Sequence, residues 1–128
     1  MTIALSPYAE MMGFVVGEDG NGRLILTMPC GDDKRGRPGF IHGGALAGLL
    51  EAVAFATLSN ALGDDDRPRI KPVNVTVTFM RGATEQPTIA RATIERLGRR
   101  TANIEAVAWQ DDPAKPVAMA QINVMLSR

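Results

Sequence analysis

Twenty consecutive residues, Gly43–Leu62, contain a single charged side chain, Glu51, among apolar and small residues. Such a run is long enough to cross a membrane, but this one is rich in alanine and glycine, and a charge at mid-membrane is expensive. We therefore interpret it as a buried helix of a soluble protein. The helix is predicted to begin near His42 or Gly43 and to end near Gly63, where glycine can take the left-handed cap conformation.

Segments that alternate with a period of two predict strands on both sides of this helix. Before it, the apolar residues 11–16 and the alternating residues 23–28 are separated by Gly20-Asn21-Gly22, which predicts a hairpin. After it, the pattern predicts consecutive strands over residues 73–79, 88–97, 101–110 and 117–126.

One long helix beside one antiparallel sheet is an α+β two-layer arrangement. The chain length of 128 residues fits one domain over residues 1–128. Within it, Gly98-Arg99-Arg100 predicts the turn of a second hairpin, and the last strand places its apolar residues on one face: Ala118, Ala120, Ile122, Val124 and Leu126.

The apolar side chains of the helix spread around most of its circumference. A helix that is apolar nearly all round should be buried nearly all round, whereas one sheet covers only one side of it. Small residues such as Ala47 and Gly48 would let another surface approach closely. We therefore expect a second copy of the chain to cover the remaining face in a two-fold dimer.

Charge and composition argue against several function classes. Lys and Arg number 14, as do Asp and Glu, so the net charge of zero gives no general attraction to nucleic acid or to anionic membranes. Aromatic residues are few and are not interleaved with basic ones. The amino-terminal residues lack a signal-peptide pattern, so we expect a cytoplasmic protein. Cys30 is the only cysteine, which excludes an intrachain disulfide and a cysteine-based zinc site.

His42, the only histidine, precedes Glu51 by nine residues. On one helix, nine residues correspond to about 13.5 Å of rise and about two and a half turns, so the two side chains point to opposite sides. If they belong to one active site, that site must take His42 from one subunit and Glu51 from another. This inference agrees with the dimer expected from the apolar helix.

Glu51 has no cation three or four positions away along the helix. An unpaired acid on an apolar helix is costly unless it is solvated, paired from elsewhere or used in chemistry, and desolvation makes a carboxylate a better proton acceptor. His42 is followed by Gly43 and Gly44, where free N–H groups and the helix dipole favour a developing oxyanion and a substrate carbonyl can approach closely. Function and a structural role remain open for Glu51, which could pair with an arginine across a dimer or reach solvent.

These residues resemble the hotdog-fold acyl-CoA thioesterases of the phenylacetic-acid-degradation type. The matching pattern is His-Gly-Gly followed by an apolar helix with an acid nine positions after the histidine, here HGGALAGLLE. The resemblance continues through VNVTVTFMRGA and IERLGRRTANIEAVAWQDD and covers most of the chain from about Gly36 onward. It implies a long helix wrapped by a curved antiparallel sheet, and a homodimer, or a homotetramer built from two dimers, with sites between subunits.

The resemblance also implies roles for individual residues. Glu51 would be the general base or nucleophile toward the thioester, the Gly43 N–H would polarise the carbonyl, and His42 would order the helix start. The substrate would be an acyl-CoA, with no cofactor beyond its own coenzyme A and no metal. For the coenzyme A phosphates the sequence offers three arginines, which suit bidentate phosphate contacts but could equally be exposed turn residues: Arg81, Arg99 and Arg100.

Two positions depart from the family pattern. Many members carry Asn or Gln six residues before the histidine, where this chain has Gly36. Members also place Ser or Thr near the acid from the start of the next strand, where the closest counterparts are Pro72 and Asn74, and Asn74 is the candidate substitute. Besides a thioesterase, the sequence leaves open an acyl-thioester hydratase or dehydratase and a non-catalytic acyl-CoA-binding protein.

Overall fold

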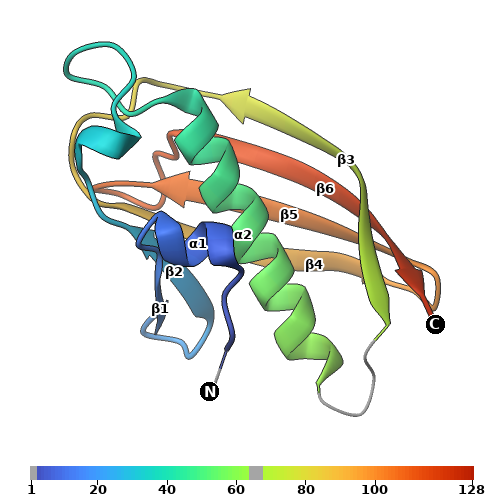
Figure 1. Ribbon diagram of the computed structural model, residues 1–128. Helices are drawn as coiled ribbons and strands as arrows, with labels where there is room; N and C mark the ends of the chain where they lie inside the picture. Colours follow the sequence, from blue (N-terminus) through green and yellow to red (C-terminus); the bar gives the residue numbers. More distant parts are fainter. Residues whose placement is uncertain (1–2, 64–67) are drawn as a thin grey trace.

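The computed structural model describes residues 3–63 and 68–128. It contains one long helix and a six-stranded antiparallel sheet in the order β1-β2-β4-β5-β6-β3. The helices are α1 (Pro7–Met11), the 3-10 turn η1 (Asp32–Lys34) and α2 (Gly43–Leu62), and the strands are β1 (Val15–Glu18), β2 (Leu24–Met28), β3 (Arg69–Phe79), β4 (Thr88–Leu97), β5 (Thr101–Trp109) and β6 (Ala118–Ser127). Figure 1 shows α2 lying across one face of the curved sheet. The predicted α+β arrangement is confirmed.

The core lies between α2 and the sheet. Leu49, Leu50 and Val53 of α2 are completely buried, and many of the buried strand positions in the same core are alanines. Because alanine is small, the helix can lie close to the strands. The residues predicted to share one face of the last strand are all buried, as expected for the inner face of β6: Ala118, Ala120, Ile122, Val124 and Leu126.

The predicted limits of α2 are confirmed at both ends. His42 is the N-cap residue, and Gly63 follows the last helical residue. Gly63 has a positive φ of 72°, which favours glycine, but its ψ of −173° lies outside the left-handed helical region. By length and composition, α2 is the one helix among the described residues that could cross a membrane, and it is here the core helix of the sheet.

The first hairpin is confirmed as the antiparallel pair β1 and β2, but its first strand begins at Val15 instead of Met11. Met11 is the last residue of helix α1. Pro7 is its first residue, and the side chain of Ser6 caps it. A helix of five residues is too short to show a hydrophobic period, so the apolar residues 11–16 suggested only a strand. The hairpin β4–β5 forms at its predicted place.

Strand β3 begins at Arg69, four residues earlier than the alternation suggested, and forms one edge of the sheet. Pro72 fits there because an edge strand tolerates a missing N–H donor. The register to β6 shifts between Pro72 and Asn74, so Val73 occupies a bulge and is 56% exposed. Val73 therefore does not share the inner face with Val75 and Val77, contrary to the alternation.

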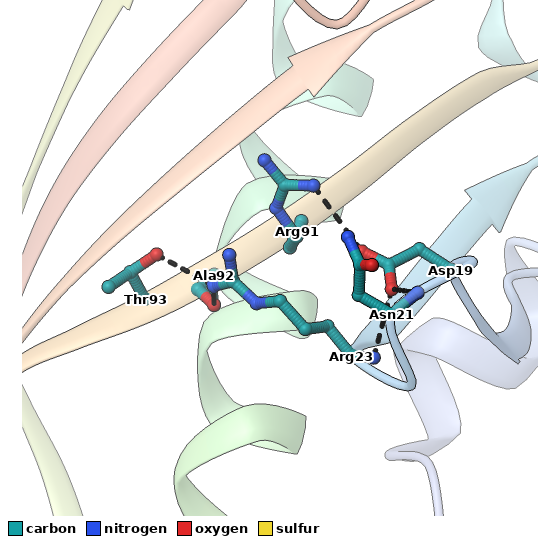
Figure 2. A network of polar contacts seen from close by, with 6 residues as sticks. All are labelled: Asp19, Asn21, Arg23, Arg91, Ala92 and Thr93. Carbon is teal, nitrogen blue, oxygen red and sulfur yellow. Dashed lines mark hydrogen bonds and ion pairs between the residues drawn. The ribbon is translucent and has the colours of Figure 1, made fainter.

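A polar network ties the β1–β2 turn to β4, as Figure 2 shows. Asp19 accepts hydrogen bonds from the backbone N–H groups of Asn21 (2.8 Å) and Arg23 (3.0 Å) and from Arg91 of β4 (3.4 Å). Arg23 in turn donates to the Ala92 carbonyl oxygen at 3.0 Å and to the Thr93 hydroxyl at 2.9 Å. The hydrogen bonds from the Arg23 and Asn21 N–H groups, with a smaller contribution from Arg91, lower the pKa of Asp19.

Candidate functional site

The first turn of α2 leaves one backbone donor free. The Gly44 N–H donates to Nδ1 of His42 at 2.8 Å, and the His42 carbonyl oxygen accepts from the N–H groups of Ala45 (3.0 Å) and Leu46 (3.2 Å). Among the hydrogen bonds of the described residues, none uses the Gly43 N–H. A donor at the positive end of a twenty-residue helix is suited to holding an anionic oxygen.

The loop before α2 is held from two sides, which fixes where the helix begins. The His42 N–H donates to the Lys34 carbonyl oxygen at 2.7 Å, and the Ile41 N–H donates to that of Ala83 at 2.9 Å. Position 36 is crowded, because a Cβ there would lie 3.1 Å from the His42 Cα and the backbone would have to give by a few tenths of an ångström. The amide side chain that the family resemblance implies is absent at this position, which lies directly against the histidine backbone.

Ion pairs hold the same loop. Lys34 is buried, and its Nζ contacts the Asp33 carboxylate at 2.8 Å. Arg35 bridges Glu85 at 2.5 Å and Asp32 at 3.0 Å. Glu85, with a smaller contribution from Asp32, raises the pKa of Arg35. The loop and the segment after β3 are thus joined beside the helix start.

A cavity of about 480 Å³ opens at this helix start. Its lining includes His42 and Gly43, together with the two arginines Arg37 and Arg81. Arg37 was missed from the sequence; its guanidinium lies 4.5 Å from the centroid of the Phe40 ring. Two guanidinium groups beside a helix N-terminus suit a ligand that carries phosphate.

Glu51 lies elsewhere, on the face of α2 that is turned away from the sheet. It is partly buried and lines a separate cavity of about 320 Å³, together with residues of α1 and of the same helix face: Ser6, Tyr8, Gly44, Ala47, Gly48, Ala52 and Phe55. Within the described part of the chain, no hydrogen bond or ion pair to the Glu51 carboxylate is formed. Glu51 therefore lies apart from His42 and Gly43 of the same chain. The nine-residue offset predicts this separation.

Asn74 does not lie with Glu51. It accepts a hydrogen bond from Asn123 at 2.7 Å, and Asn123 accepts one from Asn103 at 2.6 Å, on the sheet face opposite α2. The neighbours of Asn123 along β6, Ile122 and Val124, are the ones that point into the core. The expectation that Asn74 substitutes near the acid is thus not supported within one chain, because the strand pleat turns it to the outer face.

Arg99 and Arg100 lie far from Arg81. Both are exposed in the turn between β4 and β5, and the Arg100 carbonyl oxygen accepts from the N–H of Leu126. Phe79 lines the cavity at the helix start and pairs with Ala118. Ala118 and Leu126 are eight residues apart on β6, which is about 26 Å of strand. Figure 1 shows this turn beside the carboxyl terminus, at the other end of the sheet from the helix start.

The described residues contain no group of three or more His, Cys, Asp and Glu side chains that could hold a metal ion. One cavity presents the free Gly43 N–H and two arginines, and the other presents the Glu51 carboxylate.

Comparisons with known proteins agree with this geometry. Residues 32–125 match the family model for the acyl-CoA thioesterase N-terminal domain. The chain is similar to a candidate thioesterase of Ralstonia eutropha JMP134 that is related to phenylacetic acid degradation, at 26% identity and a TM-score of 0.80, over 96% of this chain and 92% of that one. It is 30% identical to a protein of Chromobacterium violaceum, with a TM-score of 0.75, over 95% of this chain and 84% of that one.

A protein of Bacillus halodurans, whose structure was solved with CoA, shares the fold at 20% identity and a TM-score of 0.84, over 96% of this chain and 80% of that one. Comparison with curated proteins gives no match.

Proposed function

The chain belongs to the hotdog-fold thioesterase superfamily, and from that membership we propose that it hydrolyses acyl-coenzyme A thioesters to a free acid and coenzyme A. The observation that carries the proposal is the free Gly43 N–H at the start of α2, beside a cavity that two arginines line. Such a donor stabilises the developing oxyanion in thioester hydrolysis, and a carboxylate can act as the general base that activates the water.

In the proposed reaction, the Glu51 carboxylate takes a proton from water while the water oxygen bonds to the thioester carbonyl carbon. The Gly43 N–H stabilises the negative oxygen that results. When the intermediate collapses, the C–S bond breaks, and the departing thiolate of coenzyme A takes the proton that Glu51 holds, which restores the carboxylate. Direct attack by the Glu51 carboxylate on the same carbon, followed by hydrolysis of the anhydride, uses the same groups.

The proposed site joins two chains. Glu51 and Gly43 line separate cavities in one chain, so the Glu51 of one subunit would act with the partner's Gly43. Two surfaces support pairing of copies: β3 is an edge strand of eleven residues with an open backbone, and the outer face of α2 carries the partly buried Phe55 beside Glu51. Exposed strand edges favour pairing with another chain.

Arg37 and Arg81 are the proposed contacts to the coenzyme A phosphates, since both line the cavity at the helix start. A relative of the same fold was solved with CoA, which supports this ligand class. Arg99 and Arg100 would reach the same ligand only from another subunit. We also retain the cytoplasm as the proposed location.

The first test follows thiol release from aliphatic and aromatic acyl-CoAs by wild type and by Glu51→Gln. A principal acid–base group is worth about 10² to 10⁴ in rate, so we expect a loss of at least about 100-fold at unchanged oligomeric mass. A folded Glu51→Gln protein with wild-type activity would contradict the role of Glu51.

The oxyanion donor has its own matched pair of variants. Gly43→Pro removes the N–H, and the structure tolerates proline because Gly43 is the first helical residue and His42 before it is extended (φ −64°, ψ 135°). Gly43→Ala keeps the N–H and adds a Cβ that meets only the exposed Phe79 ring, at 3.2 Å. We expect Gly43→Pro to lose about 10² to 10³ in kcat relative to Gly43→Ala. Equal activity of the two variants would exclude the Gly43 N–H as the donor.

A second candidate function is binding of acyl-CoA without cleavage. The glycine at position 36, packed on His42, favours it, because a side chain that could position water is missing there. Retention of a radiolabelled acyl-CoA by wild type without thiol release would identify a binding protein.

A further inference from the structure

The short helix α1 places Tyr8 over the outer face of α2. Proline stands at the first helical position, and the Ser6 hydroxyl accepts from the Ala9 N–H at 3.2 Å, which fixes where the helix begins. Ala9 is 1% exposed, so α1 is anchored in the core on its inner side. The Tyr8 ring also meets the Phe14 ring edge to face, at 6.1 Å between centroids and 78° between planes. The ring is therefore held in one place.

A glycine in α2 makes room for this ring. A Cβ at position 48 would lie 2.3 Å from the Tyr8 hydroxyl oxygen and 2.9 Å from two ring carbons. Glycine inside a helix costs about 1 kcal/mol relative to alanine. Gly48 is thus explained by the ring that covers it.

The Tyr8 hydroxyl lies beside Glu51. Gly48 and Glu51 are three residues apart on α2, and Cβ positions at that spacing are about 5–6 Å apart on one helix face. Both Tyr8 and Glu51 line the same cavity of about 320 Å³. No hydrogen bond of the described residues uses the Tyr8 hydroxyl, and Tyr8 is 43% exposed. A phenylalanine would pack over Gly48 equally well, so packing does not explain the hydroxyl.

We propose that the Tyr8 hydroxyl is a further catalytic group of the Glu51 site: it donates a hydrogen bond to the group on which Glu51 acts, the water or the thioester. This inference rests on the proposed thioesterase function. Because both side chains line this cavity, a group bound there can meet the hydroxyl and the carboxylate together. The hydroxyl acts on the reacting group, whereas the aromatic ring contributes packing.

The test is Tyr8→Phe, which keeps the ring and its contacts with Phe14 and Gly48 and removes only the hydroxyl. We expect kcat for acyl-CoA hydrolysis to fall about three- to tenfold, the range for one neutral hydrogen bond, while KM and the melting temperature stay at wild-type values. Met11→Ala is the matched control on the same helix, because Met11 is 70% exposed and lines none of the cavities described above. It is expected to leave kcat unchanged.

A second variant tests the same point without touching Tyr8. In Gly48→Ala, the new methyl group displaces the ring together with its hydroxyl, so its kcat should fall at least as far as in Tyr8→Phe, and the double variant should lose little more than Gly48→Ala alone. Wild-type kcat in Tyr8→Phe, with activity lost in Glu51→Gln, overturns the inference and leaves the thioesterase intact. Fully additive losses also overturn it. A wild-type protein that cleaves no thioester overturns the proposed function itself.

Discussion

The His42 side chain caps α2, and substitutions can test whether it does anything more. Its Nδ1 accepts from the Gly44 N–H at 2.8 Å, which caps α2, and the Gly43 N–H beside it is left free. The structure gives the imidazole no contact with Glu51 in the same chain. An ordering role therefore explains the histidine without any proton transfer.

This account predicts different results for two variants of His42. Asparagine can accept the same capping hydrogen bond, whereas alanine cannot, and loss of an N-cap costs about 1 kcal/mol. We expect His42→Asn to keep the stability and the kcat of wild type within about threefold, and His42→Ala to lower the free energy of unfolding by about 1 kcal/mol. Urea unfolding and thiol release measure both. A kcat in His42→Asn as low as in Glu51→Gln would show that the imidazole itself takes part in the reaction.

At the scale of elements, the hairpin β1–β2 depends on a carboxylate. Asp19 accepts two backbone N–H groups and Arg91, and these lower its pKa below the usual value in the folded state. A group with a lowered folded pKa stabilises the fold above its unfolded pKa, and this contribution is lost as the pH falls through the folded value. The contribution of Asp19 should therefore be complete at neutral pH, begin to fall near the unfolded pKa of about 4, and be lost as the pH drops through the lower folded pKa.

The variant Asp19→Asn tests this pH dependence, because asparagine can still accept the backbone hydrogen bonds but carries no charge. We expect it to be less stable than wild type at pH 7 and the two urea midpoints to converge as the pH falls below about 4. Asp111→Asn removes an exposed carboxylate without a hydrogen bond of its own and serves as the control. A difference between wild type and Asp19→Asn that stays constant with pH would contradict the electrostatic origin.

Elements marked by a local sequence signal, an uninterrupted apolar run or a period of two, were predictable from the sequence, and features set by strand pairing were not. The twenty residues of α2 and the alternation in β4 to β6 are local signals, so their limits agree with the structure. The bulge at Val73 depends on which residues of β6 lie opposite, which the sequence of β3 does not contain. In the same way, the separation of Glu51 from His42 follows from helix geometry. Tyr8 lines one cavity and Arg37 the other only because of the tertiary fold, which the local sequence does not show.

For the whole molecule, the remaining question is how the two cavities meet. The sheet covers one side of α2, and α1 crosses part of the other, so Glu51 and its neighbours on the outer helix face stay accessible in one chain. We expect light scattering to give at least twice the chain mass of 13.7 kDa. A monomer that hydrolyses acyl-CoA would contradict a site shared between subunits.

A shared site predicts how inactive chains complement each other. A heterodimer of Glu51→Gln and Gly43→Pro chains, isolated through two different tags, would contain one site with both natural residues and one with neither. We expect about half of the wild-type activity per dimer, although each homodimer is nearly inactive. The reciprocal control pairs a wild-type chain with a chain that carries both substitutions. If the sites are shared between subunits, each site of this control dimer contains one substituted residue, so the control should be inactive. If each site lies within one chain, the two results should be reversed.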